Sequence, residues 1–116
     1  MKIAIVGSRS IFISASDIEK YISQIDEIVS GGARGVDTAA AEFAKLKGLK
    51  LTEFLPEYSL YGRAAPIIRN RQIVDYADKI IIFWNGASKG TLSVIKYAQK
   101  TKKPCEIIIR EDGVFK

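Results

Sequence analysis

The chain has 116 residues, of which 47% are hydrophobic and 27% are charged, and its formal net charge is +5. These values are typical of a soluble globular protein, so we expect residues 1–116 to form one domain. The sequence contains no histidine and one cysteine, which excludes histidine-based triads, histidine metal sites and an internal disulfide.

Five short apolar runs rich in β-branched residues predict strands. The last two runs are continuously apolar, which is typical of strands covered on both faces. Because helical patterns lie between the runs, we predict an α/β fold: a Rossmann-like three-layer α/β/α sandwich with a mainly parallel five-stranded sheet. Cys105 lies in the last run, so we expect a buried core thiol. The predicted strands cover residues 2–6, 27–29, 49–55, 79–84 and 105–109.

Four helices are expected between these strands, each with a residue that suits one of its ends. Ser16 and Asp17 suit the start of the first helix, whose apolar face extends to Ile25, and Ser88 suits the start of the fourth. Gly48 is a C-terminal cap for the second helix. Pro66 suits the first turn of the third. The last three helices are predicted over residues 36–47, over residues 66–76, and from residue 89 or 90 to residue 102.

No apolar run approaches the roughly 20 residues that a membrane span requires. Gly7 interrupts the first apolar run too early for a signal peptide. We therefore expect a cytoplasmic protein that has no membrane partner.

The segment Ser30-Gly31-Gly32-Ala33-Arg34-Gly35-Val36-Asp37 joins the second predicted strand to the second predicted helix. Its glycines allow a tight turn that brings backbone N–H groups close to a ligand, and the helix that follows presents the positive end of its dipole. Arg34 adds a permanent cation. This pattern predicts a phosphate-binding loop. Asp37 either binds a ribose hydroxyl, fixes Arg34, or simply suits the first helical turn.

Two further loops have the same character: Gly7-Ser8-Arg9 after the first predicted strand, and residues 84–91 after the fourth. The carboxyl ends of parallel strands meet at one edge of a sheet, so three loops should converge there. Such a cluster predicts a nucleotide rather than a bare phosphate.

Two other segments are expected to reach the same edge. Residues 56–65 are predicted to form a loop, in which Tyr58 or Tyr61 either stacks on a base or covers the core. On the third helix, Arg69 and Arg71 cannot both face the site, and we assign Arg69 to it. The candidate ligand-binding residues are Gly7, Ser8, Arg9, Ser30, Gly31, Gly32, Ala33, Arg34, Gly35, Asp37, Arg69, Asn70, Ser88, Gly90 and Thr91.

In this order, the motifs resemble the SLOG superfamily, in particular its small YspA-like, YpsA-related branch. The resemblance implies a Rossmann-like domain that binds a nucleotide or an ADP-ribose-type, NAD-derived molecule, requires no cofactor, and forms a homodimer or a higher homo-oligomer. It covers nearly the whole chain and rests on Gly7-Ser8-Arg9, residues 30–37, Arg69-Asn70, Ala77-Asp78 and Ser88-Lys89-Gly90-Thr91.

The superfamily also includes the LOG phosphoribohydrolases and the Rossmann-like domain of DNA processing protein A. LOG enzymes carry a catalytic glutamate in a Pro-Gly-Gly-x-Gly-Thr-x-x-Glu motif, and Val94 stands at that position here. Valine cannot transfer a proton or stabilise an oxocarbenium-like centre. Cleavage of an N-glycosidic bond would therefore need another acid, for which Glu57 and Asp78 are the candidates.

Three functions follow from the sequence. We favour binding of a nucleotide-type ligand by a sensor, carrier or sequestering protein. The alternatives are a LOG-like nucleoside-monophosphate phosphoribohydrolase, and a single-stranded DNA-binding protein that uses a lysine-rich helix. For that helix we rank a solvated helix end above DNA binding. The lysines concerned are Lys96, Lys100, Lys102 and Lys103.

Overall fold

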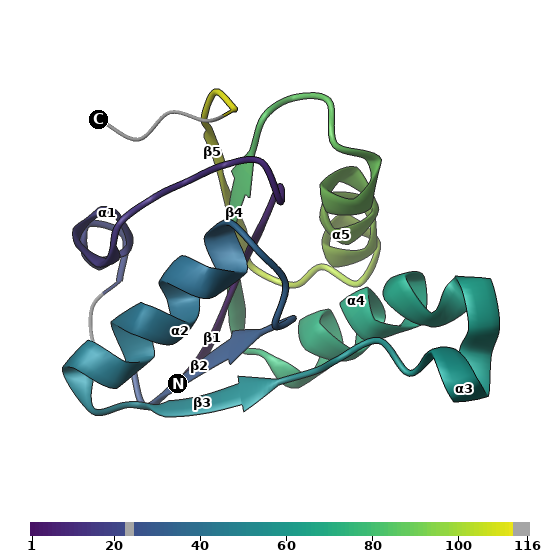
Figure 1. Ribbon diagram of the computed structural model, residues 1–116, viewed down its shortest axis with the longest axis horizontal. Coiled ribbons are helices and arrows are strands. Elements are labelled where there is room, and N and C mark those ends of the chain that lie inside the picture. Colours follow the sequence, from purple (N-terminus) through teal and green to yellow (C-terminus); the bar gives the residue numbers. More distant parts are fainter. Residues whose placement is uncertain (23–24, 113–116) are drawn as a thin grey trace.

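The computed structural model describes residues 1–22 and 25–112. Its strands form one parallel five-stranded sheet in the order β3-β2-β1-β4-β5 (Figure 1), which confirms the predicted α/β, Rossmann-like sandwich. The elements in chain order are β1 (Lys2–Gly7), α1 (Ala15–Glu19), β2 (Glu27–Ser30), α2 (Val36–Lys47), β3 (Lys50–Glu53), α3 (Tyr58–Tyr61), the 3₁₀ helix η1 (Gly62–Ala64), α4 (Ala65–Tyr76), β4 (Lys79–Trp84), α5 (Lys89–Lys100) and β5 (Cys105–Ile109).

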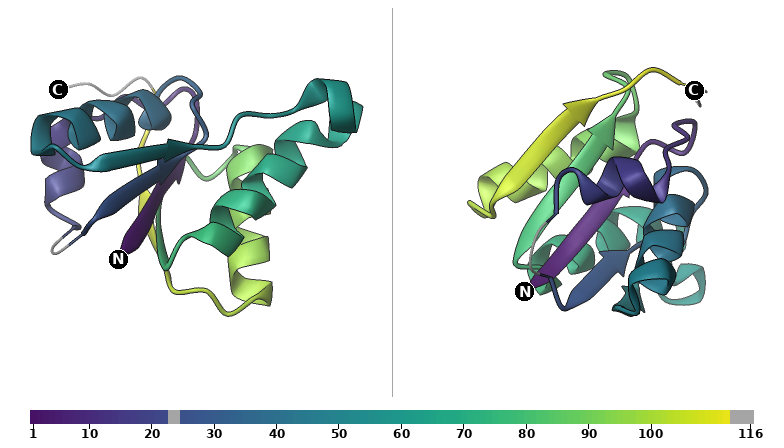
Figure 2. Two further views of the ribbon diagram at one scale, coloured as in Figure 1. Left: turned by 90° about the horizontal axis from the view of Figure 1, so that it is seen from below. Right: turned by 90° about the vertical axis from the view of Figure 1, so that its left-hand side faces the viewer.

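Two hydrophobic clusters hold the layers together, one on each face of the sheet. Ile3 and Ile5 of β1 pack on the face that α1 and α2 cover. Ala4 and Val6 lie on the other face, beneath α4 and α5. Figure 2 shows the two pairs of helices on opposite sides of the strands. The continuously apolar central strands follow from this double coverage.

The loops after β1 and β4 leave the sheet toward opposite faces, because β1 leads to α1 and β4 leads to α5. These two strands are neighbours, paired from Ile3 with Lys79 to Gly7 with Phe83. A parallel sheet opens a crevice where adjacent loops diverge in this way, and such crevices bind ligands. The topology therefore places a candidate site at the carboxyl end of β1.

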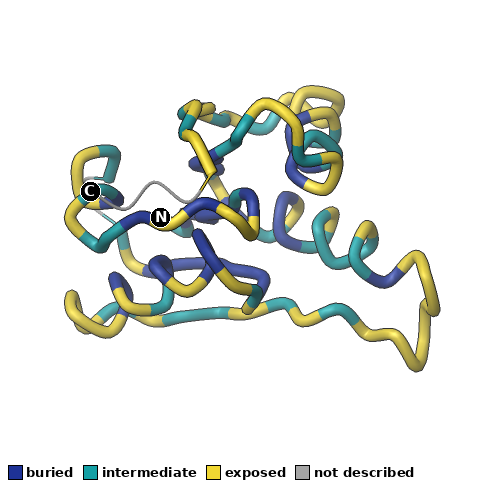
Figure 3. Tube along the Cα trace, turned by 45° about the horizontal axis from the view of Figure 1, so that its top comes forward, coloured by how far each residue is buried: buried dark blue, intermediate teal, exposed yellow. Residues whose placement is uncertain are grey.

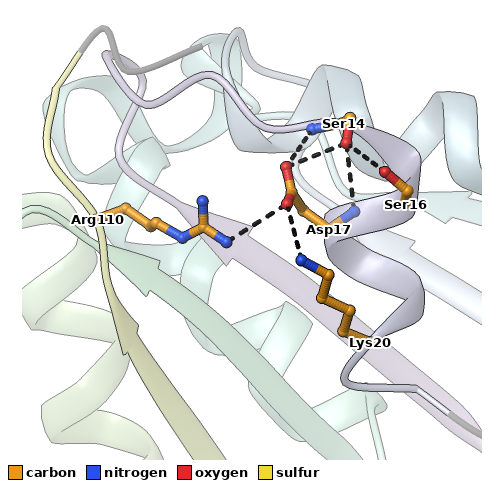
Figure 4. Close-up of polar contacts among 5 residues, drawn as sticks. All are labelled: Ser14, Ser16, Asp17, Lys20 and Arg110. Atoms are coloured by element: carbon orange, nitrogen blue, oxygen red, sulfur yellow. Dashed lines mark hydrogen bonds and ion pairs between the residues drawn. The ribbon is translucent and has the colours of Figure 1, made fainter. Parts of the chain in front are cut away.

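The first helix is shorter than predicted, and its N-cap lies two residues earlier in the chain. Ser14, rather than Ser16 or Asp17, is its N-cap. The Ser14 Oγ accepts a hydrogen bond from the Asp17 amide at 3.3 Å, and the Asp17 carboxylate accepts one from the Ser14 amide at 2.9 Å (Figure 4). This reciprocal capping box satisfies two N–H groups at the helix start. Ile25 packs on the core from outside the helix, and residues 23–24 lie outside the described part.

Three other predictions from sequence need correction. The third strand covers only Lys50–Glu53, and residues 56–65 are not a loop but contain α3, η1 and the start of α4. The helix α3 has no buried residue, so no apolar periodicity marks it in the sequence (Figure 3). Cys105 is half-buried, because β5 is an edge strand.

Gly35 provides a test of how tightly the β1 and β2 loops pack. A Cβ at this position would lie 2.7 Å from the Arg9 carbonyl oxygen and 2.8 Å from that of Ile11. Gly62 has a similar backbone, with φ 56° and ψ −131° against 72° and −120° for Gly35, but it has open space around it. We expect Gly62→Ala to lower the free energy of unfolding by about 1–3 kcal/mol, because alanine is strained in this backbone conformation. Gly35→Ala should lower the free energy of unfolding, measured in urea, by clearly more than Gly62→Ala does. Equal losses of stability in the two variants would contradict the close packing of the two loops.

Candidate functional site

A cleft of about 470 Å³ opens at the carboxyl ends of β1 and β2, a volume typical of small-molecule sites. Its walls come from the loops after β1, β2 and β3, from α4, and from the first half of α5. Of the residues predicted to bind a ligand, the cleft is lined by Gly7, Arg9, Gly31, Gly32, Ala33, Asp37, Arg69, Asn70, Ser88, Gly90 and Thr91.

The other four predicted residues lie outside this lining. Ser8 and Ser30 are buried, and each supports a loop: the Ser8 Oγ accepts a hydrogen bond from the Asn85 amide at 3.4 Å, and the Ser30 Oγ accepts one from the Gly32 amide at 3.4 Å. Gly35 permits the close approach of the β1 loop. Arg34 is exposed and lines a separate shallow hollow that it shares with Arg9.

A side chain of the protein itself occupies part of the glycine loop after β2. The Asp37 Oδ2 accepts a hydrogen bond from the Ala33 amide at 3.1 Å, and it would lie 3.1 Å from a Cβ at Gly31. Asp37 is only 8% exposed. The sequence predicts a phosphate in this loop, but a carboxylate occupies part of it, because Asp37 stands in the first turn of α2, where its side chain folds back onto the loop.

Burial raises the pKa of Asp37 to about 6, since the charged form loses its hydration inside the cleft wall. The hydrogen bond from the Ala33 amide and the nearby charge of Arg69 oppose this rise in pKa, while Glu53 adds to it. Asp37 is thus a carboxylate that titrates close to neutral pH, a property common in functional sites.

Arg69 of α4 places its guanidinium directly against this loop. Its Nη1 donates to the Gly31 carbonyl oxygen at 2.8 Å, and its Nε donates to the Asn70 Oδ1 at 3.0 Å. A guanidinium has five N–H donors, so donors remain for a ligand. Arg71, two residues along the same helix, is exposed and lies 5.4 Å from the Tyr97 ring centroid. Arg69 lines the cleft and Arg71 does not.

The start of α5 forms the opposite wall and carries unpaired backbone donors. Ser88 is the N-cap, and its Oγ accepts from the Thr91 amide at 3.3 Å. Within residues 1–22 and 25–112, no acceptor is bonded to the amides of Lys89 and Gly90. The helix is 12 residues long, so its dipole adds positive potential at this end. These two amides and the dipole suit an anionic group.

The floor of the cleft is apolar and was not predicted from the sequence. Val6, Ile73 and Val94 are buried side chains that line it. An apolar residue on a strand or helix gives no sequence signal that separates a cleft floor from an ordinary core position. Tyr58 also lines the cleft and is 61% exposed, whereas Tyr61 is not part of the lining.

The two acids suggested for a hydrolase lie elsewhere. Asp78 accepts a hydrogen bond from the Lys2 amide at 2.7 Å, at the amino end of β1, which is the opposite edge of the sheet from the cleft. Glu57 is exposed and is not part of the lining. Among the described residues that line the cleft, Asp37 is the single carboxylate.

The lysine cluster also lies away from the cleft, at the far end of α5. Lys103 uses its Nζ to donate to the Ala77 carbonyl oxygen at 2.6 Å. Lys96, Lys100 and Lys102 are exposed. This position agrees with a solvated helix end, where the helix dipole stabilises cations.

Comparison with known proteins finds no match: no family model, no curated protein and no solved structure matches the chain. In the part of the chain that is described, no helix has both the length and the apolar character needed to cross a bilayer. The same residues contain no group of three or more Asp, Glu, Cys or His side chains placed to hold a metal ion. The assignment to the SLOG superfamily stays a prediction.

The buried carboxylate gives a pH-dependent prediction. The folded pKa of Asp37, about 6, lies above its ordinary value of 3.8, so the folded state binds more protons than the unfolded state between these values. The contribution of Asp37 to the free energy of unfolding should therefore fall by up to about 3 kcal/mol as the pH rises through this window.

Other carboxylates titrate too, so the measurement is the difference between wild type and Asp37→Asn in urea unfolding from acid to neutral pH. We expect wild type to lose stability relative to the variant as the pH rises. A difference that is independent of pH would show that the Asp37 pKa is not raised.

Proposed function

We propose that the protein binds a nucleotide or an ADP-ribose-type molecule in this cleft, as a sensor, carrier or sequestering protein. The observation that carries the proposal is the start of α5, where Gly90 lines the same cleft as Arg69 and an apolar floor, and where no acceptor among the described residues is bonded to the Gly90 amide or to that of its neighbour Lys89. A nucleotide has the matching parts: an anionic phosphate, a hydroxyl-bearing sugar and a flat base.

The phosphate is assigned to the start of α5. The amides of Lys89 and Gly90 would donate to its oxygens, and the helix dipole would stabilise its charge. Arg9 and Arg69 line the cleft and supply cations. Arg34, which the sequence placed at the phosphate, lies outside the lining and has no part in this arrangement.

The sugar is assigned to the glycine loop. Asp37 is ionised above its pKa of about 6 and can accept a hydrogen bond from a ribose hydroxyl, while it continues to accept one from the Ala33 amide. Its negative charge disfavours a phosphate at this place. The loop that resembles a phosphate cradle in sequence thus suits the sugar better.

The hydrolase and DNA-binding alternatives gain less support. Glycoside cleavage ordinarily uses a pair of carboxyl groups, and among the described lining residues only Asp37 carries one. The exposed lysines proposed for DNA lie at the end of α5 remote from the cleft. Association of two copies, which the resemblance implies, would use a surface other than the cleft.

Arg69 and Arg71 form a matched pair for testing the ligand site. Both lie on α4, but only Arg69 lines the cleft. In calorimetric titrations with AMP, ADP-ribose and cyclic ADP-ribose, we expect wild type to bind at least one ligand. Arg69→Ala should weaken that binding by about 1.5–3 kcal/mol, the value of a hydrogen bond to a charged group. Arg71→Ala should bind as wild type does. Absence of binding by wild type, or equal losses in both variants, would refute the assignment.

Tyr58 and Tyr61 test whether the cleft accepts a base. Tyr58 lines the cleft beside Leu55 and Pro56, which makes this end of it apolar. We expect Tyr58→Ala to weaken AMP binding by about 1–3 kcal/mol, the usual loss when a base loses an aromatic partner. Binding of ribose 5-phosphate, which has no base, should be unaffected, and Tyr61→Ala should change neither. If Tyr58→Ala weakened both ligands equally, the tyrosine would support the cleft without contacting a base.

A further inference from the structure

The two edges of the sheet differ in how well they are protected against pairing with a strand of another molecule. At one edge, β3 carries exposed charges at both ends, Lys50 and Glu53, which discourage pairing with another strand. At the other edge, β5 has three consecutive isoleucines, and Ile107 and Ile109 are 39% and 64% exposed. Figure 2 shows β5 at the margin of the sheet. An apolar edge strand of this kind is a ready template for another strand.

The backbone of β5 leaves alternate residues free to pair. The Ile80 amide donates to the Pro104 carbonyl oxygen at 3.0 Å, and the Arg110 amide donates to that of Trp84 at 2.9 Å. Even-numbered residues of this segment therefore bond to β4, as the register of Ile82 with Ile107 requires. The N–H and C=O groups of Cys105, Ile107 and Ile109 point away from the sheet. No other described segment pairs with them.

We propose that a second copy of this chain pairs with the outer edge of β5, antiparallel and centred on Ile108. In this register Ile107 of each copy lies opposite Ile109 of the other, and these residues exchange backbone hydrogen bonds. The two exposed isoleucines then cover each other across the junction. The two five-stranded sheets become one continuous sheet with a two-fold axis, which is the symmetry expected of a homodimer.

Charge selects this register from its neighbours. Glu106 in β5 and Arg110, which directly follows the strand, are four positions apart and so lie on the same face of the sheet. Pairing centred on Ile108 sets Glu106 of each copy opposite Arg110 of the other. These are non-hydrogen-bonded positions, where the side chains of the two strands come closest. Pairing centred on Glu106 would instead set two glutamates face to face, which is unfavourable. Edge pairing on Ile108 thus forms two ion pairs between copies.

Within one copy, Glu106 and Arg110 each already have an ion-pair partner, but the distances between the charged atoms are long. The Glu106 Oε2 lies 3.9 Å from the Lys79 Nζ, and the Arg110 Nη2 lies 3.5 Å from the Asp17 Oδ1 (Figure 4). Lys79 is exposed enough to remain hydrated, and Asp17 also has its capping bonds and Lys20. Neither contact prevents the charged ends from meeting a second copy.

The pairing leaves both clefts open. Each cleft lies at the carboxyl ends of β1 and β2, whereas the junction runs along the side of β5. Because the copies are antiparallel, their clefts open at opposite ends of the joined sheet. Dimer formation and ligand binding are therefore independent, and each can fail without the other.

Charge reversal tests the register directly by sedimentation or by size exclusion with light scattering. Wild type should be dimeric. Glu106→Arg sets arginine opposite arginine and Arg110→Glu sets glutamate opposite glutamate, so each variant alone should be monomeric. An equal mixture of the two should regain the dimer, because every opposed pair is then complementary. Glu42→Arg and Lys96→Glu reverse exposed charges away from the edge and should stay dimeric.

Several results would overturn the proposal. A monomeric wild type, single variants that stay dimeric, or a mixture that stays monomeric would each exclude this register. Arg110→Glu also removes the contact with Asp17, so thermal unfolding must show that the variants are folded. If either is not, Ile109→Lys provides the test: its side chain is 64% exposed in one copy, so it should fold and be monomeric. A dimeric Ile109→Lys would exclude the edge.

Discussion

The parallel pairing of β1 with both β2 and β4 is the constraint on which the rest of the structure depends. It places β1 at the centre of the sheet and directs all carboxyl ends to one edge. The chain then covers one face with α1 and α2 and the other with α4 and α5. The loops diverge where β1 and β4 meet, and the cleft forms beside this point. A change in pairing would remove the site together with the fold.

Within that frame, Asp37 decides what the glycine loop can bind. A buried carboxylate costs stability at neutral pH unless hydrogen bonds and a cation compensate, and here the Ala33 amide and Arg69 do so only in part. The residual destabilisation appears as the raised pKa. Carboxyl groups with perturbed pKa values are common in functional sites. In the proposed arrangement, Asp37 excludes phosphate from the glycine loop and leaves the start of α5 as the place for an anion.

The sequence predicts the sheet and most of the helices because their signals are local: continuous apolar runs, Gly48 as a cap, and Ser88 at the start of α5. It also predicts that three loops meet at one edge, which follows from parallel strands. It misses α3, which buries nothing, and the floor formed by Val6, Ile73 and Val94, since nothing local separates a cleft from a core. It also misplaces Arg34, because the direction of a loop side chain depends on its neighbours in space.

The most direct test is a crystal structure of the protein with the nucleotide that binds it most tightly. The account predicts the phosphate at the amides of Lys89 and Gly90, the sugar hydroxyl on Asp37, and an unchanged hydrogen bond from the Ala33 amide to that carboxylate. A phosphate seated in the loop of residues 31–35, with Asp37 displaced from it, would contradict the account, as would a ligand bound outside the cleft.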